Sequence, residues 1–388
     1  MLHQPPYKIL HVITDLDMGG AEMVLYRLLA AQDRKEFAEQ VVSLTTFTPV
    51  GELIHALGIP VHALGMPAGV PDPRLVTHLA GLMRRLKPDL VHTWMYHADL
   101  AGGLASRWAG SPPVVWGLHH SVAQPGALKP ATYFIARLNA LLSRVLPVKI
   151  ICCAEATCQT HCRLGYLARK MVVIPNGIDP SVYRSDAGLR HAVRRELGLD
   201  DDTSLVGLCA RFAPQKDHAN FMRAAGILHT SMPAVHFLLW GKGIDPANVA
   251  LVSWIRAAGV ESNVHLLGLR SDSPRLTAAI DLACLGSAYG EALPLAVGEA
   301  MSSEVPCVVT DVGDSALLVG ETGLVVPVRD PQALAAAWVE LLSLPPEERR
   351  ALGRKARQRI LDHYSLEKMV AAYAGLYRDI ITGSRHRK

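Results

Sequence analysis

Two glutamates stand eight positions apart in the stretch YGEALPLAVGEAM, which runs from Tyr289 to Met301. On one continuous helix, eight steps of about 100° would leave Glu291 and Glu299 on different faces. Pro294 lies between them, and proline is favoured in the first turn of a helix but disrupts its interior. The spacing therefore predicts a helix that opens at Pro294, with Glu291 on the preceding loop and Glu299 in the second turn. A loop that feeds a helix N-terminus is suited to bind an anion.

A second candidate stretch is CARFAPQKDHANF, where Arg211 and Lys216 stand five positions apart on a proline-containing loop. The loop follows a short apolar run of the kind typical of a strand. Arginine offers a planar fork and lysine a point charge, so the two side chains together can bind a phosphate group. Taken alone, an ordinary solvated loop is an equally good interpretation.

The two glutamates could also be the acid and nucleophile of a glycosidase, whose carboxyl groups stand about 5 Å apart in retaining enzymes. Hydrolases seldom need an adjacent phosphate site, however, and a helix N-terminus favours the charged form of Glu291 over a proton donor. Carboxylates also accept hydrogen bonds from paired sugar and ribose hydroxyls. Together with Arg211 and Lys216, the glutamates therefore predict a sugar-nucleotide site.

Two glycines separate the first predicted strand from a helix in TDLDMGGAEMVLYRLLA, where Gly19 and Gly20 allow a ligand to approach the backbone. The stretch lacks the GxGxxG spacing of dinucleotide-binding folds, which disfavours an NAD site. Asp15 and Asp17 form a DxD, an arrangement that can hold a divalent cation in some transferases. A turn that leads into the helix is the favoured interpretation of these aspartates.

Two histidines, His119 and His120, follow the predicted strand in PPVVWGLHHS. A lone histidine is usually structural. A pair at the carboxyl end of a strand, where open parallel sheets bind ligands, favours a functional role.

Composition describes a well-packed globular chain of 388 residues, of which 50% are apolar and 19% charged. The formal charge of +4 is small for this length and does not indicate a nucleic-acid partner. We see neither a signal peptide nor a long apolar run, and therefore expect a cytoplasmic protein. Seven cysteines are expected to be reduced thiols, and the cluster CCAEATCQTHC fits no common zinc-binding spacing.

Short apolar strands alternate with helical patterns twice along the chain, which predicts two doubly wound parallel sheets of the α/β class. A stretch rich in turn formers, IPNGIDPSVYRSD, separates the two series. We therefore expect one Rossmann-like domain over residues 1–185 and another over 186–365, with a terminal helix over about 366–388. Strand ends of two such domains would face an interdomain cleft.

The segment ATYFIARLNALLSRVL (131–146) is apolar with Arg137 and Arg144 interspersed. It could dock on an anionic membrane surface, which would place the protein peripherally on the inner face of the cell membrane. A buried helix is the preferred interpretation.

The whole chain resembles glycosyltransferase family 4, the retaining enzymes of the GT-B fold. The resemblance rests on an ordered set of motifs: GGAE, VVIPNGID, ARFAPQK, and EALPLAVGE followed by AMSSEVPCVVTDVGD. Each motif is weak alone, but the ordered set is specific and spans nearly the whole chain. The resemblance implies two Rossmann-like domains, a donor bound mainly by the second, an acceptor bound by the first, and a terminal helix that crosses back to the first.

Residue roles follow from the same resemblance. It implies that Arg211 and Lys216 bind the donor diphosphate, Glu299 the ribose hydroxyls and Glu291 the transferred sugar. His119 corresponds to the histidine that lies beside the sugar in the family. The residues expected at the donor are Gly19, Gly20, Arg211, Lys216, Glu291, Ala292, Leu293, Pro294, Leu295 and Glu299, with His120, Gly241 and Leu269 as further candidates.

The implied reaction moves a hexose from a UDP- or GDP-sugar to a glycan or lipid-linked acceptor in polysaccharide biosynthesis. Positive charge from Arg211, Lys216 and the helix terminus would stabilise the leaving diphosphate, so no metal or other cofactor is expected. Two alternatives stay open at this point. One is a sugar-nucleotide epimerase of the same fold, and the other is a catalytically silent sugar-nucleotide-binding subunit of a membrane complex.

Overall fold

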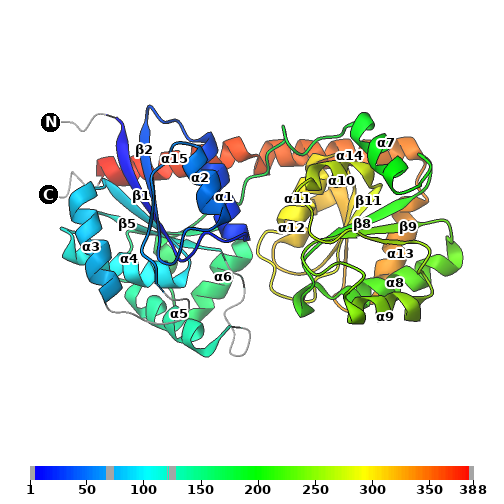
Figure 1. Ribbon diagram of the computed structural model, residues 1–388, viewed down its shortest axis with the longest axis horizontal. Coiled ribbons are helices and arrows are strands. Elements are labelled where there is room, and N and C mark those ends of the chain that lie inside the picture. The colour runs from blue at the N-terminus through cyan, green and yellow to red at the C-terminus, as the bar shows by residue number, and fades with distance from the viewer. Residues whose placement is uncertain (1–4, 67–73, 120, 122–127, 384–388) are drawn as a thin grey trace. The chain divides into compact units, whose positions relative to one another are not determined.

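The computed structural model describes residues 5–66, 74–119, 121 and 128–383, which form two compact units (Figure 1). The first unit contains the chain up to Gly177 together with the segment from Leu366 onward, and the second contains Ile178–Ser365. The fold class predicted from the sequence is confirmed, because each unit is a parallel sheet with helices on both faces.

The boundary between the units lies earlier than the predicted one after residue 185. Residues just beyond Gly177 are held by the second unit through hydrogen bonds. The Ile178 N–H donates to the Tyr364 carbonyl at 2.8 Å, and the Arg357 guanidinium donates to the carbonyls of Pro180 and Tyr183 at 3.1 Å each. Turn-forming composition marked the linker but could not show which unit these carbonyls bind.

Seven parallel strands make the sheet of the first unit, in the order β3-β2-β1-β4-β5-β6-β7. The strands are β1 (Tyr7–Ile13), β2 (Phe37–Ser43), β3 (Val61–Ala63), β4 (Leu90–Trp94), β5 (Val114–Leu118), β6 (Lys149–Cys152) and β7 (Met171–Val173). The helices are α1 (Gly20–Ala31), α2 (Pro49–Ala56), α3 (Arg74–Leu86), α4 (Tyr96–Trp108), α5 (Pro130–Leu142), α6 (Glu155–Leu164) and α15 (Leu366–Gly383), with a short 3₁₀ turn at Ala168–Lys170. All five residues of β4 and of β5 are buried, as expected for strands covered on both faces.

Six parallel strands make the second sheet, in the order β10-β9-β8-β11-β12-β13. They are β8 (Leu205–Cys209), β9 (His236–Trp240), β10 (Val264–Leu266), β11 (Leu282–Leu285), β12 (Cys307–Thr310) and β13 (Gly323–Val326). The helices are α7 (Ala187–Glu196), α8 (His218–Ser231), α9 (Val249–Ala258), α10 (Ser273–Ala279), α11 (Leu295–Ser302), α12 (Ser315–Val319), α13 (Pro331–Leu342) and α14 (Pro346–Arg359), followed by a π-helical turn at Ile360–Tyr364. Short 3₁₀ turns occur at Pro214–Lys216 and Gly320–Thr322.

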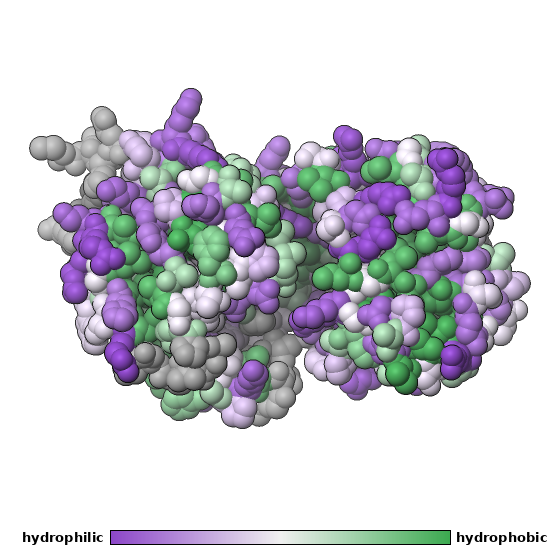
Figure 2. Space-filling view, viewed as in Figure 1, coloured by the Kyte–Doolittle hydropathy of each residue, from purple (hydrophilic) through white to green (hydrophobic). Residues whose placement is uncertain are grey.

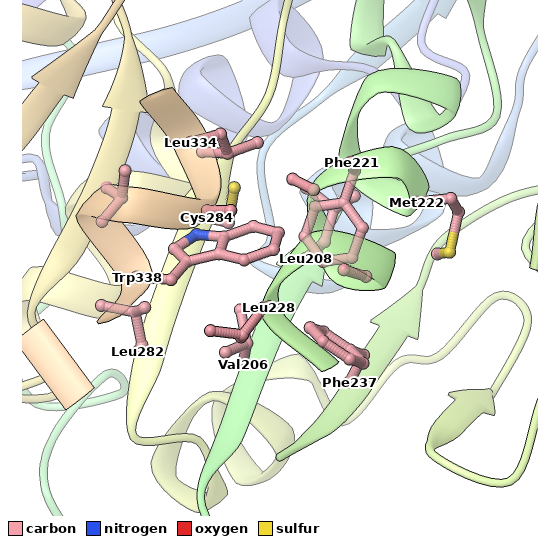
Figure 3. Packing of buried hydrophobic residues seen from close by; sticks show 14 of the residues in the cluster. Val206, Leu208, Phe221, Met222, Leu228, Phe237, Leu282, Cys284, Leu334 and Trp338 are labelled. Carbon is pink, nitrogen blue, oxygen red and sulfur yellow. The ribbon is translucent and has the colours of Figure 1, made fainter. Parts of the chain in front are cut away.

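The core of the second unit is built around the buried indole of Trp338 (Figure 3). Its ring lies 5.0 Å from that of Phe221 and 5.9 Å from that of Phe237, which brings α13, α8 and β9 together. Burial of these large side chains removes apolar surface from water and thereby stabilises this unit.

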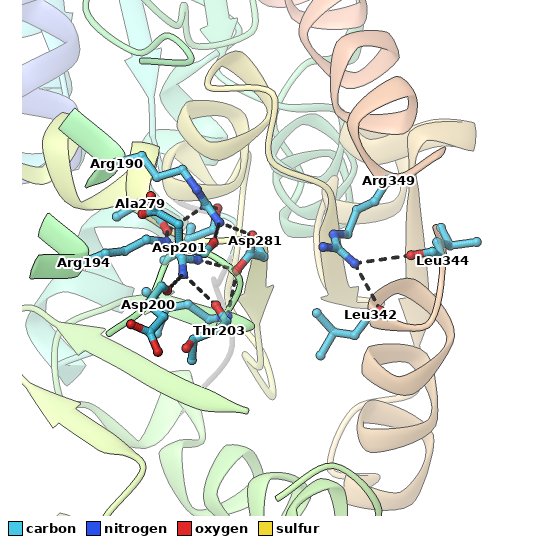
Figure 4. Close-up of polar contacts among 12 residues, drawn as sticks. Arg190, Arg194, Asp200, Asp201, Thr203, Ala279, Asp281, Leu342, Leu344 and Arg349 are labelled. Carbon is cyan, nitrogen blue, oxygen red and sulfur yellow. Dashed lines mark hydrogen bonds and ion pairs between the residues drawn. The ribbon is translucent and has the colours of Figure 1, made fainter. Parts of the chain in front are cut away.

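Opposite charges tie α7 to the start of the strands in the second unit (Figure 4). Asp281 accepts hydrogen bonds from the guanidinium groups of Arg194 at 2.6 Å and Arg190 at 2.7 Å, and from the Leu205 N–H at 2.9 Å. The Arg194 side chain is fully buried. This cluster of ion pairs lies where the strands begin. It is therefore at the opposite end of the sheet from the carboxyl ends of the strands, which carry the candidate site.

Helix α15 packs onto the first unit, with Met369, Tyr373, Tyr377 and Ile381 among its buried residues. These positions recur every four residues or multiples of four and therefore share one helix face. The helix belongs to the first unit although it follows the whole second unit in the sequence.

Helix α5 is only partly buried. Ala136, Asn139 and Ala140 point into the unit, whereas Phe134 and Leu141 are 68% and 66% exposed. The preferred interpretation of this segment as a buried helix is therefore wrong for its outer face. Periodicity in the sequence was masked because apolar residues occupy both faces of the helix.

No helix among the described residues is long and apolar enough to cross a bilayer. Hydrophilic side chains are spread over the visible face of each unit, with apolar side chains interspersed (Figure 2).

Candidate active site

The candidate site in the second unit lies at the carboxyl ends of β8 and β11, which are neighbours in the sheet. The strand order reverses here, because β9 and β10 lie on one side and β12 and β13 on the other. Open parallel sheets bind ligands at such a switch point. The loop after β8 carries Arg211 and Lys216, and the loop after β11 carries Glu291.

Lys216, Ser287 and Glu291 form one cluster. Oε1 of Glu291 accepts hydrogen bonds from Lys216 Nζ at 2.5 Å and from Ser287 Oγ at 2.6 Å. Glu291 and Lys216 are 9% and 18% exposed at their side chains, so the ion pair is largely shielded from water. Charge-assisted hydrogen bonds are stronger than neutral ones, and the cluster fixes the position of the carboxylate.

A second link joins the same two loops through Gln215. The Gln215 side-chain amide donates to the Gly290 carbonyl at 3.0 Å, and the Gln215 main-chain carbonyl accepts from the Ala288 N–H at 2.9 Å. The loops after β8 and β11 are thus joined by the contacts of Gln215 as well as by the ion pair of Lys216 and Glu291.

Helix α11 begins at Leu295, with Pro294 as its N-cap. This agrees with the predicted helix opening at the proline, with Glu291 before the helix and Glu299 in its second turn. The first N–H groups of a helix have no carbonyl partner within it, so this end of α11 offers donors to an anion.

The backbone of the loop before α11 is supported by the loop that follows β12. The Asp314 N–H donates to the Ala292 carbonyl at 2.9 Å, and Leu293 is buried. Gly313 has a φ of +60°, and a Cβ there would lie 2.2 Å from the Glu291 carbonyl oxygen. Only glycine allows this close approach, which holds the peptide groups of Glu291 and Ala292 in place.

Glu299 has different surroundings from Glu291. It is buried on α11 and faces the end of β8. Cys209 lies at this strand end, where its own burial and then the negative charge of Glu299 raise the pKa of the Cys209 thiol to about 12. Glu299 therefore lies beside the β8 strand end, whereas Glu291 lies beside Lys216. The two carboxylates occupy separate environments within one site.

Arg211 is exposed on the loop after β8. Its backbone packs against Gly241, which has a φ of +144° and where a Cβ would lie 2.2 Å from the Ala210 carbonyl oxygen. Leu269, on the loop after β10, is 76% exposed. These candidates thus lie on the β8–β10 side of the switch point, and neither Arg211 nor Leu269 joins the Lys216 cluster.

In the first unit, Gly19 is the N-cap of α1 and Gly20 begins the helix. A Cβ on Gly19 would lie 2.2 Å from Glu22 Oε2, whereas one on Gly20 would meet nothing within 4 Å. Burial raises the pKa of Glu22 to about 7. The negative charges of Asp15 and Asp17 act in the same direction, whereas a backbone hydrogen bond lowers the pKa in part. The glycine loop therefore carries a carboxyl group that titrates near neutral pH.

Asp15 and Asp17 hydrogen-bond the local backbone. Asp15 accepts from the Asp17 N–H at 3.2 Å, and Asp17 accepts from the Met18 N–H at 2.8 Å. The interpretation of this DxD as a turn that leads into α1 is confirmed.

No group of three or more His, Cys, Asp or Glu side chains within residues 5–66, 74–119, 121 and 128–383 is arranged to hold a metal ion. All seven cysteines are free thiols.

His119 directly follows β5, and its imidazole stacks on the indole of Trp94 with ring centroids 4.8 Å apart and an interplanar angle of 14°. His120 lies outside the described residues. Sequence reasoning missed Trp94, Ser287 and Gln215. Ser287 stands four positions before Glu291 at a strand end, which is a usable signal, but nothing local marks Trp94 as a partner of His119.

Two family models match the chain. The model described as Glycosyltransferase Family 4 matches residues 18–182, and the model described as Glycosyl transferases group 1 matches residues 203–344. The chain belongs to glycosyltransferase family 4. It is a glycosyltransferase, and neither the epimerase nor the silent binding subunit is favoured.

Relatives of this glycosyltransferase have diverse donors and acceptors in their names. The UDP-Gal:alpha-D-GlcNAc-diphosphoundecaprenol alpha-1,3-galactosyltransferase of Escherichia coli is 24% identical over 80% of this chain and 81% of its own length. The MMP alpha-(1->4)-mannosyltransferase of Mycolicibacterium hassiacum is 25% identical over 81% of this chain and 77% of its own.

Among solved structures, HepE from Anabaena in complex with UDP superposes with a TM-score of 0.84 at 22% identity, over 96% of this chain and 100% of that one. This likeness supports the GT-B fold.

Proposed function

We propose that this glycosyltransferase moves a hexose from a UDP- or GDP-sugar to a glycan or lipid-linked acceptor in polysaccharide biosynthesis, with retention at the anomeric carbon. The observation that carries the proposal is the cluster of Lys216, Ser287 and Glu291 at the start of α11. It sets a cation, a carboxylate and a helix N-terminus side by side at the switch point of the second sheet.

Each donor group has a proposed partner. Arg211 and Lys216 bind the diphosphate together with backbone groups of Ala292–Leu295 and of the Gly19–Gly20 loop. Glu299 accepts hydrogen bonds from the ribose hydroxyls. Glu291 accepts hydrogen bonds from the transferred sugar, and His119 acts on the same sugar.

The reaction breaks the bond between the anomeric carbon and the diphosphate oxygen and forms a bond from that carbon to the acceptor oxygen. The proton of the acceptor hydroxyl passes to the departing phosphate oxygen, so retention needs no protein nucleophile. Lys216, Arg211 and the α11 terminus stabilise the negative charge that develops on the leaving group. These three groups supply positive charge at the diphosphate, which is the basis for proposing that no metal is needed.

The outer face of α5 supports a proposal for where the enzyme works. Five exposed side chains follow one another at spacings of one, three or four along α5 and the residues just after it. They are Phe134, Arg137, Leu141, Arg144 and Val145. Residues 100–154 contain no Asp or Glu, whereas their basic residues are Arg107, Lys129, Arg137, Arg144 and Lys149.

A groove of about 320 Å³ adjoins this face and is lined in part by Arg107, Val145, Val148 and Lys170. Exposed apolar side chains among basic ones suit the surface of an anionic bilayer. We propose that α5 docks peripherally on anionic lipid.

Vesicle flotation tests this proposal. Anionic vesicles should retain the enzyme in a flotation assay, and neutral vesicles should not. Exchanging Arg137 and Arg144 for glutamine should weaken retention, unlike the same exchange at the exposed Arg350.

Donor choice tests the central proposal. The protein should be incubated with a panel of UDP- and GDP-sugars, with and without a lipid-linked or glycan acceptor, and nucleoside diphosphate release should be followed. We expect one donor to raise thermal stability, since a ligand that binds only the folded state stabilises it. Release that depends on acceptor supports transfer. Interconversion of the donor sugar without acceptor would contradict the proposal.

A further inference from the structure

A stripe of histidine and aromatic side chains crosses the first sheet beside His119. Strand β4 pairs with β1, with His92 opposite His11, and with β5, with Trp94 opposite Gly117. Alternate residues of a strand face the same side of the sheet, so His92 and Trp94 share one face. Their ring contacts with Tyr373 and Tyr377 show that α15 covers this face. The stripe therefore connects α15 to the end of β5.

The indole of Trp94 is fixed from the β1 side. Its Nε1–H donates to His11 Nδ1 at 3.2 Å, which leaves the other ring nitrogen of His11 to donate to Glu39 Oε1 at 3.3 Å. Trp94 and His11 are fully buried and Glu39 nearly so. Because both ring nitrogens of His11 are engaged, the imidazole has one orientation, and the indole bonded to it has one as well.

Helix α15 fixes the other side of the stripe. The Tyr377 hydroxyl lies 2.7 Å from His92 Nδ1, and the His92 ring lies 4.5 Å from the ring of Trp94. Tyr373 is parallel to the indole within 14°, at 6.2 Å. Burial, followed by the nearby His11 and His119, keeps the pKa of His92 well below its ordinary value, so the His92 side chain is neutral.

Gly117 leaves room between the two imidazoles. A Cβ at this position would lie 3.1 Å from His92 Nε2 and 3.4 Å from His119 Nε2. Any larger residue would press on both rings. The His119 ring thus rests on Trp94, and its Nε2 and that of His92 border the same space.

We propose that Trp94, held by His11 and by the His92–Tyr377 contact from α15, positions the His119 imidazole for sugar transfer. The inference rests on the proposed role of His119, and it adds three positioning residues, Trp94, His92 and Tyr377. None of them is proposed to touch the substrate. Their effect passes through the ring of His119.

A physical need for such support follows from the position of His119 just after the end of β5. A side chain there has several staggered rotamers, and catalysis falls steeply when a reacting group is misplaced. Stacking on a fixed aromatic face selects one of these rotamers.

Three variants separate the parts of this arrangement. Trp94→Leu removes the stacked ring, Trp94→Phe keeps an aromatic face but removes the Nε1–H, and Tyr377→Phe removes only the hydroxyl beside His92. Tyr166→Phe is the matched control, because Tyr166 is buried in the same unit and its ring contacts are with Trp116 and His161.

The main measurement is a ¹H–¹³C NMR correlation spectrum of the full chain with ¹³C-labelled histidine. The His119 signal is assigned by its loss in His119→Gln. In the parent protein, the ring current of the stacked indole should move the His119 ring protons upfield. Trp94→Leu should abolish this displacement, Trp94→Phe should retain part of it, and Tyr377→Phe should broaden or shift the signal. Tyr166→Phe should leave it unchanged.

Turnover is the second measurement. We expect Trp94→Leu to lower kcat by about 10-fold or more, with partial rescue in Trp94→Phe. Tyr377→Phe should lower kcat by about 3-fold, the effect of one neutral hydrogen bond. Calorimetric affinity for the free nucleoside diphosphate should stay the same in all variants.

The outcomes distinguish the positioning proposal from the role of His119. If His119→Gln keeps full turnover, the catalytic role of His119 is wrong, and the spectra alone then decide whether Trp94 positions its ring. If His119→Gln is inactive but the other variants keep parental spectra and kcat, the positioning proposal is wrong. Should Trp94→Leu fail to fold, Trp94→Phe and Tyr377→Phe decide the question by the same two measurements.

Discussion

Glu299→Gln and Glu291→Gln should fail in different ways, because the two carboxylates have different surroundings in one site. Glu299 lies beside the end of β8, and its proposed partner, the ribose, is present in both the intact donor and the free nucleotide. Replacing a charged acceptor by a neutral amide removes about 1 to 3 kcal/mol of hydrogen-bond energy. We therefore expect Glu299→Gln to weaken the binding of both ligands by about 5-fold to 150-fold.

Glu291→Gln removes the negative charge that pairs with Lys216 at 2.5 Å. The free nucleotide has no sugar, so its binding loses no contact to Glu291, and the released Lys216 remains available to the diphosphate. We expect nucleotide affinity to be unchanged or a few-fold tighter, whereas turnover falls and donors that differ at one hydroxyl are discriminated less well.

Isothermal titration of both variants with UDP and GDP, next to turnover with the preferred donor, measures this difference. Ser287→Ala is the matched control for Glu291, because it removes the other donor to Oε1 while keeping the carboxylate and its ion pair. It should have a smaller effect on turnover than Glu291→Gln. If Glu291→Gln loses nucleotide affinity as severely as Glu299→Gln, the proposed division between sugar and ribose is wrong.

Four further outcomes test other parts of the structure. Arg211→Ala and Lys216→Ala should each lower turnover by about 10²-fold in a folded protein, the scale for removing one group that stabilises transition-state charge, and near-parental rates would contradict the diphosphate assignment. Activity should persist in EDTA, and a complete loss that Mg²⁺ or Mn²⁺ restores would disprove metal independence. The pKa of Glu22 is raised from 4.5 to about 7 in the folded protein, so the free energy of unfolding should fall by up to about 3 kcal/mol as pH rises from 4.5 through 7. Urea titrations at pH 5 and pH 8 measure this fall, which should be absent in Glu22→Gln. Asp281→Ala leaves the guanidinium of Arg194 buried without its carboxylate partner and should destabilise the second unit by about 3 to 5 kcal/mol in thermal unfolding, with donor chemistry intact wherever the unit remains folded.

Local chemistry made several features predictable from the sequence. The alternation of apolar runs and helical patterns indicated two parallel sheets, and Pro294 indicated where α11 starts, since its ring constrains the chain whatever its neighbours are. The turn at Asp15 and Asp17 was predictable because aspartate side chains hydrogen-bond backbone groups one or two residues away. These features depend on residues that are close in sequence.

Contacts between distant residues were not predictable. Lys216 meets Glu291 only because β8 and β11 are neighbours in the sheet, and no sequence pattern states which strands pair. The stack of His119 on Trp94 likewise depends on the register of β4 and β5. The exposure of Phe134 on α5 could not be predicted either, because an apolar side chain has the same identity whether or not another element covers it.

The position of α15 in the chain has a consequence for how the protein is made. During synthesis the strands of the first unit leave the ribosome long before Leu366 does, because the whole second unit is translated in between. Until α15 arrives, the sheet face that carries His11, His92 and Trp94 has not received the tyrosines that cover it. A nascent chain therefore holds an incomplete first unit until Leu366–Gly383 has been translated, and the docking of this helix completes the unit.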